Sequence, residues 1–133
     1  MNIFTPKGFL QVGGAVLVLV GILGYVGIIG PTPDHSLFGN LWWFDNGENL
    51  VHLVLGIVAL LAASMLKDMG MQKNLVILVG VIALLVAVYN LFSNTLLGSN
   101  LESPMDFILH LVVGVWAFMA AFKKSSSAMP SAM

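Results

Sequence analysis

The chain has 133 residues, of which 59% are hydrophobic and only 8% are charged. Charged residues make up about a quarter of an ordinary soluble domain, so this composition excludes that class and indicates an integral membrane protein. The chain has no cysteine, which excludes disulfides and cysteine-based metal centres, and no arginine or lysine cluster of the kind a nucleic-acid surface needs.

Four apolar runs predict four transmembrane helices, at residues 9–29, 50–66, 75–92 and 107–122. A helix needs about 20 residues to cross the hydrocarbon core, and the shorter runs gain length from their flanks. Continuous rather than alternating runs favour helices over strands. Lys7 precedes the first run as in a secretory signal, but the run is long and no small-residue cleavage pattern follows. A retained helix is therefore expected there.

We predict an all-α membrane protein, a four-transmembrane-helix bundle made of two tandem helical hairpins. A single domain is expected over residues 1–124, with repeats at about 9–66 and 75–122 joined by a polar turn at 67–74. Residues 125–133 are small and polar, which predicts a disordered cytoplasmic tail.

The lysines predict the orientation in the cell membrane. With four spans they all lie on one side, and the positive-inside rule makes that side cytoplasmic, so both termini are expected inside. Most of the acidic residues then lie on the opposite side. The lysines are Lys7, Lys67, Lys73, Lys123 and Lys124, and the acids opposite are Asp34, Asp45, Glu48, Glu102 and Asp106.

A short phrase occurs twice, at the start of the second and of the fourth predicted helix. An acid, the tripeptide His-Leu-Val, a glycine and Ala-Ala recur at the same spacing, which predicts two copies of one structural unit. Glu48 and His52 in the first copy correspond to Asp106 and His110 in the second. Because each unit has two spans, the units are expected to run in the same direction.

In each copy the acid and the histidine are four residues apart, hence one helical turn apart on one face. The acids have a structural interpretation as helix caps: Asp106 follows Ser103 in a capping-box pattern with Pro104 at the first helical position, and Glu48 follows Asp45 in the same way. Each histidine is expected to pair with the acid one turn above it. The two pairs would then be a polar plug joining the second and fourth helices.

Functional interpretations of the same residues stay open. His52 and His110 are candidate cofactor ligands, for the iron of a haem or the magnesium of a chlorin, although no cofactor is the default. Together with Glu48 and Asp106 they are candidate ligands of a divalent metal. The polar layer is also a candidate proton or ion path. A di-iron carboxylate centre is disfavoured, because the first and third helices contain no acid.

Other residues have a packing interpretation and a functional one. Glycines crowd the first helix, which predicts close packing inside the bundle or a seam against a partner. Aromatic residues 42–44 predict an anchor at the headgroup level or a lip for an apolar ligand. Tyr25, Tyr89 and Asn90 are polar residues inside spans and are expected to bond neighbouring backbone.

Residues Asn49, His52, Leu53 and Gly56 form the pattern Asn-x-x-His-Leu-x-x-x-Gly. This pattern resembles the signature of a family of small four-span prokaryotic membrane proteins catalogued only as a domain of unknown function. The second copy departs from it, with Phe107 in place of the asparagine. The resemblance implies a four-helix membrane protein and supplies no activity, substrate or catalytic residue.

The sequence predicts a non-enzymatic protein, since it has no nucleophile–base set, phosphate loop or zinc-peptidase motif. We expect a small structural or accessory subunit in the lipid bilayer, associated with itself or with a larger membrane complex and not with nucleic acid. Binding of haem, chlorin or a divalent metal, and proton or ion conduction, are the alternatives.

Overall fold

A computed structural model describes residues 1–123 of the chain. Lys124 and the tail at 125–133, for which we expect disorder, lie outside the described residues. Within residues 1–123 there are four helices long and apolar enough to cross a membrane, which confirms the predicted fold class. They are α1 (Pro6–Tyr25), α2 (Asn46–Met65), α3 (Met69–Asn90) and α4 (Met105–Phe122).

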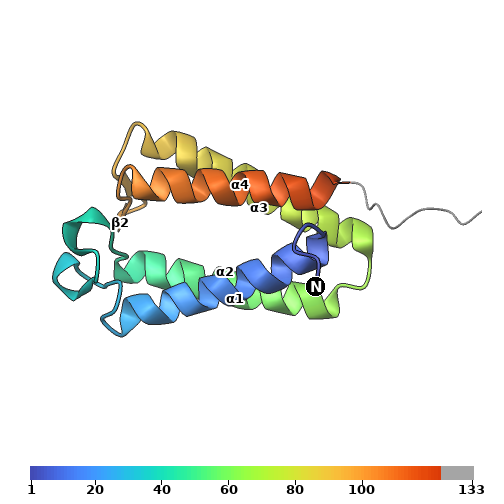
Figure 1. Ribbon diagram of the computed structural model, residues 1–133, viewed down its shortest axis with the longest axis horizontal. Helices are drawn as coiled ribbons and strands as arrows, with labels where there is room; N and C mark the ends of the chain where they lie inside the picture. The colour runs from blue at the N-terminus through green and yellow to red at the C-terminus, as the bar shows by residue number, and fades with distance from the viewer. Residues whose placement is uncertain (124–133) are drawn as a thin grey trace, which may run out of the picture.

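The helices form two hairpins that run in the same direction, α1 with α2 and α3 with α4, as Figure 1 shows. All lysines of the described chain lie at one end of the bundle, which we call the lysine end. The opposite end, the loop end, carries the connections at residues 26–45 and 91–104. The hairpins contact each other mainly through α1 with α3 and α4, and through the loop end.

The turn between the hairpins is shorter than predicted. Residues 67–74 are polar and were expected to be a turn, but α3 begins at Met69 because the Asp68 side chain caps it. The Asp68 carboxylate accepts hydrogen bonds from the backbone N–H groups of Gly70 and Met71, at 2.7 and 3.1 Å. Such a cap supplies acceptors for N–H groups that have no partner within the helix.

Helix α1 ends earlier than the apolar run that predicted it. It stops at Tyr25, and the chain turns at Gly27, whose φ of +87° favours glycine. The connection that follows contains two short 3₁₀ turns, η1 (Pro33–His35) and η2 (Gly39–Leu41). The second connection at the loop end contains a small antiparallel hairpin, β1 (Thr95–Leu96) with β2 (Ser99–Asn100).

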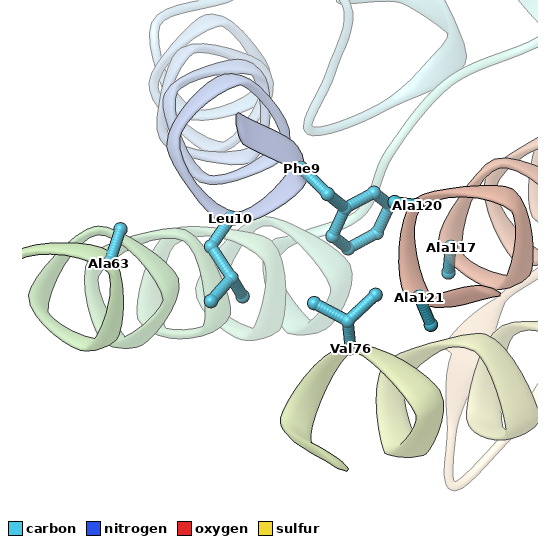
Figure 2. Close-up of a cluster of buried hydrophobic side chains, with 7 residues drawn as sticks. All are labelled: Phe9, Leu10, Ala63, Val76, Ala117, Ala120 and Ala121. Carbon is cyan, nitrogen blue, oxygen red and sulfur yellow. The ribbon is translucent and has the colours of Figure 1, made fainter. Parts of the chain in front are cut away.

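At the lysine end all four helices contribute to one apolar core, shown in Figure 2. The ring of Phe9 from α1 meets the ring of Trp116 from α4 edge to face, with the centroids 4.5 Å apart. Small residues on α4 let the helices approach. The core residues are Phe9, Leu10, Ala63, Val76, Ala117, Ala120 and Ala121.

Within each hairpin the helices approach closest at glycines. A Cβ on Gly56 would lie 2.7 Å from the backbone O of Gly14 and 2.7 Å from the backbone N of Val18. In the second hairpin, a Cβ on Gly114 would lie 3.3 Å from the backbone O of Gly80. The buried glycines of α1 therefore serve packing inside the first hairpin. The alternative, a glycine seam on α1 facing a partner, stays a prediction for the glycines that do not face α2.

Candidate functional site

The four residues singled out by the repeated phrase lie near the loop end, where the hairpins meet. Glu48 is in the first turn of α2, and Asp106 is in the first turn of α4. Glu48 is 6% exposed and Asp106 is completely buried. Carboxylates buried to this degree need hydrogen-bond donors, so their partners decide what the site can do.

The Glu48 side chain is part of a capping box and does not pair with His52. Its Oε2 accepts the backbone N–H of Asp45 at 3.3 Å, while Asp45 Oδ1 accepts the backbone N–H of Glu48 at 2.9 Å. The predicted cap is confirmed, and the predicted hydrogen bond between Glu48 and His52 is wrong. The carboxylate is turned toward the helix start, where backbone donors have no helical partner.

Asp106 does not complete the capping box predicted for α4. Pro104 is the residue that flanks the helix rather than its first residue, and no side chain caps it. The carboxylate of Asp106 instead accepts two hydrogen bonds from beyond its own helix. Oδ2 accepts the backbone N–H of Glu102 at 2.6 Å, and Oδ1 accepts the indole N–H of Trp42 at 2.9 Å. A buried carboxyl group is costly to leave without such donors.

Trp42 belongs to the connection between α1 and α2, so its bond to Asp106 joins the two hairpins. Phe44 is only 1% exposed and so does not serve as the predicted headgroup anchor, whereas Trp42 and Trp43 are partly exposed and their role as anchors stays a prediction. The rings of Trp42 and Phe44 also contact each other edge to face, with centroids 5.2 Å apart. The two rings therefore pack beside the hydrogen bond between Trp42 and Asp106.

Asn100 is a member of this polar cluster that sequence reasoning missed. Its backbone N–H donates to Asp45 Oδ2 at 2.6 Å. Its side-chain amide donates to the backbone O of Trp43 at 3.4 Å and to Glu102 Oε1 at 3.1 Å. Asp45 therefore caps α2 with one oxygen and holds the second hairpin with the other. No periodicity or motif marks Asn100, because its role depends on the fold.

His110 bonds the backbone rather than the carboxylate of Asp106. Its Nδ1 lies 2.7 Å from the backbone O of Asp106. A carbonyl oxygen only accepts, so Nδ1 carries the proton and Nε2 of the neutral ring keeps its lone pair. Many metal-ligating histidines are oriented by such a bond to a backbone carbonyl.

His52 has no comparable bond. Its Nδ1 is buried without a hydrogen-bond partner among the described residues, and its ring lies edge to face with Phe44 at 5.5 Å. Neither histidine therefore forms the predicted hydrogen bond with a carboxylate.

The four candidate metal ligands do not converge. In the part of the chain that the structure describes, no three side chains of His, Asp or Glu are placed to hold a metal ion. The carboxylates of Glu48 and Asp106 are directed toward backbone and indole donors. Among the imidazoles, Nδ1 of His52 has no hydrogen-bond partner within the described residues, whereas Nδ1 of His110 is bonded to backbone.

The other residues of the Asn-x-x-His-Leu-x-x-x-Gly pattern pack against α1. Asn49 is completely buried, its amide donates to the backbone O of Phe44 at 3.3 Å, and its side chain fills the space where Gly24 lacks a Cβ. A Cβ on Gly21 would lie 3.0 Å from the Cβ of Leu53. Asn49, Leu53 and Gly56 thus form the seam of the first hairpin, whereas His52 packs against Phe44.

Tyr25 and Asn90 bond to backbone, as predicted, whereas the Tyr89 hydroxyl makes no hydrogen bond within residues 1–123 and that side chain is 43% exposed. The Tyr25 hydroxyl donates to the backbone O of Asn46 at 3.3 Å. The Asn90 amide donates to the backbone O of Ser93 at 3.1 Å and of Leu101 at 3.4 Å. The Tyr25 bond joins the end of α1 to the start of α2, and the Asn90 bonds join the end of α3 to the connection that follows it.

No protein-family model, curated protein or solved structure matches this chain. The four apolar helices and the bonds at the loop end show what class of protein this is. It is a multi-pass α-helical membrane protein with a buried polar cluster joining two hairpins. Membership of the small four-span family that the pattern resembles stays a prediction.

Proposed function

We propose that this chain is a small non-enzymatic protein of the cell membrane, with both termini on the cytoplasmic side, that works as a structural or accessory subunit. The observation that carries the proposal is the use of the buried acids. Glu48 and Asp106 are both engaged in capping or in joining the hairpins. Hydrogen bonds of this kind stabilise the fold, which supports a structural role for both acids.

The association would use a surface other than the glycine face of α1. Helix α2 contacts little beyond α1 and the loop end, and its transmembrane stretch is only 22% buried. Val51, Val54, Leu55 and Val58 lie exposed along it. An apolar helix face of this kind packs equally well against lipid or against another transmembrane helix, which is what an accessory subunit requires.

Crosslinking in native membranes tests the association. Because the chain has no cysteine, a single Val58→Cys variant places one thiol on the exposed face of α2, and Leu85→Cys places a control thiol on α3. We expect a bifunctional thiol–amine reagent to give a discrete larger species with the α2 variant and little with the control. A solitary monomer with both variants overturns the proposal.

A second candidate function is binding of a planar macrocycle, a haem or a chlorin, through His52 and His110. The Nδ1 of His52, which has no hydrogen-bond partner among the described residues, and the Nε2 of His110 favour it, because imidazole nitrogens of this kind would be able to hold the metal of such a group. When bound, a haem would supply one-electron transfer. The chain itself would contribute the two ligands and an apolar surround.

An absorption spectrum of the protein purified from a host that makes the macrocycle tests this second function. A Soret or chlorin band that is lost in His52→Ala and in His110→Ala supports it. His35→Ala is the matched control, because His35 is exposed in η1 and bonds only Thr32 among the described side chains. A colourless preparation removes the candidate.

We also propose that residues 9–66 and 75–122 arose as two copies of one unit. Gly56 and Gly114, which correspond in the repeated phrase, both lie at the closest approach within their hairpins. The first helices of the copies have since shifted. Gly21 lies opposite Leu53, whereas Gly80 lies opposite Ala117 and Phe118, so these two glycines are not at equivalent depths.

A further inference from the structure

An apolar groove of about 550 Å³ runs along α4 where the N-terminal segment of the chain crosses it. Its lining consists of apolar side chains from two separate parts of the chain. One wall comes from the N-terminal segment and α1, and the other from α4. The residues used below are Ile3, Phe4 and Val12 on the first wall and Leu111, Val115 and Met119 on the second.

The wall made by the N-terminal segment is held in place. The indole N–H of Trp116 donates to the backbone O of Ile3 at 2.8 Å. Inside the segment, the backbone N–H of Phe4 donates to Asn2 Oδ1 at 2.8 Å, and the Thr5 hydroxyl donates to the backbone O of Asn2 at 3.0 Å. The groove is therefore built by specific bonds and does not depend on a loosely packed chain end.

The groove has the length and position of one lipid chain. From Leu111 to Met119 the helical rise gives roughly 12 Å, and one leaflet of the hydrocarbon core is about 15 Å thick. Met119 is near the end of α4 at the lysine end, while Leu111 is near the middle of the helix. An extended apolar chain lying in the groove would thus run from the membrane surface toward the bilayer centre.

Cations stand at the surface end of the groove. The Nζ of Lys123 lies 4.6 Å from the centre of the Phe4 ring, and Lys123 also borders a second apolar groove of about 600 Å³ on the neighbouring side of α4. On the side of that second groove, the Nζ of Lys73 lies 4.9 Å from the centre of the Phe122 ring. A cation–π contact positions an ammonium group without using its hydrogen-bond donors, which stay free for an anion.

We infer that this groove binds an anionic phospholipid, with an acyl chain between the N-terminal segment and α4 and the phosphate at Lys123. The apolar walls are complementary to a hydrocarbon chain, and the lysine is complementary to an anionic head group. Loss of one lysine near an anionic membrane surface corresponds to about a fivefold loss of affinity. A zwitterionic lipid of the same chain length should therefore bind less tightly, because its head carries no net negative charge for the lysine to attract.

Native mass spectrometry of the full chain, from micelles containing phosphatidylglycerol or phosphatidylcholine, tests the inference. We expect one retained phosphatidylglycerol and little phosphatidylcholine. Lys123→Gln should lower that retention about fivefold. Lys67→Gln is the matched control, because Lys67 lies in the turn between the hairpins and bonds the backbone O of Ser64. Equal retention of the two lipids, or an equal loss in both variants, overturns the inference.

A second measurement does not depend on any lysine variant. Trp116 lines the groove, whereas the other tryptophans, Trp42 and Trp43, are at the loop end. Phosphatidylglycerol brominated on its acyl chain should quench the wild-type fluorescence more than brominated phosphatidylcholine does. Val115→Phe, at a half-exposed position of the wall, should fill the groove and abolish the difference. A difference that persists in this variant places the lipid elsewhere and overturns the inference.

Discussion

The indole N–H of Trp42 donates a 2.9 Å hydrogen bond to Oδ1 of Asp106, a residue 64 positions further along the chain. This bond joins the connection of the first hairpin to the start of α4 in the second. Asp106 is completely buried, so its carboxylate depends on this donor and on the backbone N–H of Glu102. The contact makes the loop end a fixed junction between two hairpins that otherwise meet mainly through α1.

Replacing Trp42 by phenylalanine should remove that donor while keeping an aromatic ring. Leaving a buried acceptor without its donor costs about 1–3 kcal/mol, so we expect Trp42→Phe to lower the free energy of unfolding by about 2 kcal/mol in detergent. Trp43→Phe is the control, because the Trp43 indole makes no hydrogen bond within residues 1–123. Equal stability of the two variants, measured by thermal unfolding, would show that the junction contributes nothing.

A methyl group added at Gly56 should separate the helices of the first hairpin. Its Cβ would lie 2.7 Å from backbone atoms of Gly14 and Val18, and backbone cannot turn aside as a side chain can. Overpacking of this kind costs about 1–3 kcal/mol, so Gly56→Ala should be destabilising by that amount.

Gly13→Ala is the matched test on the neighbouring helix. A Cβ there would meet the Trp116 ring at 3.7 Å, an ordinary contact. Alanine also favours the helix over glycine by up to about 1 kcal/mol. We therefore expect unchanged or raised stability, and a loss equal to that of Gly56→Ala would contradict the packing account.

The two histidines should differ in what they contribute to stability. His52 Nδ1 is buried without a partner in the described chain, so His52→Leu removes an unsatisfied group and should leave the unfolding free energy unchanged or higher. His110→Leu removes the bond to the Asp106 backbone and should cost about 1 kcal/mol. Chemical denaturation in micelles measures both. A larger loss for His52→Leu would mean that this ring has a structural bond after all.

The sequence was sufficient to predict the helices and their pairing. Long apolar runs and the spacing of Asp45 and Glu48 are local signals, and the capping box and the tandem hairpins follow from them. The helix boundaries were less predictable. The cap at Asp68 starts α3 within a polar stretch, and Gly27 ends the helical path before the apolar run is complete.

The partners of the buried acids could not be predicted, because they depend on contacts between hairpins. A spacing of four residues brings Asp106 and His110 onto one helical face, but a donor from a distant connection competes for the carboxylate. Trp42 supplies that donor for Asp106, and Asn100 supplies one for Asp45. Neither residue belongs to the repeated phrase, so the sequence pattern alone pointed to acid–histidine bonds that do not form.

The proposed orientation predicts which residues face the outside of the cell. Met69, at the lysine end, and Leu97, at the loop end, are both strongly exposed, and the chain has no native cysteine. A membrane-impermeant maleimide added to intact cells should label Leu97→Cys, and should label Met69→Cys only after the membrane is permeabilised. Neither substitution removes a lysine, so the charge asymmetry that sets the orientation is preserved. The opposite labelling pattern would place both termini outside, against the positive-inside rule.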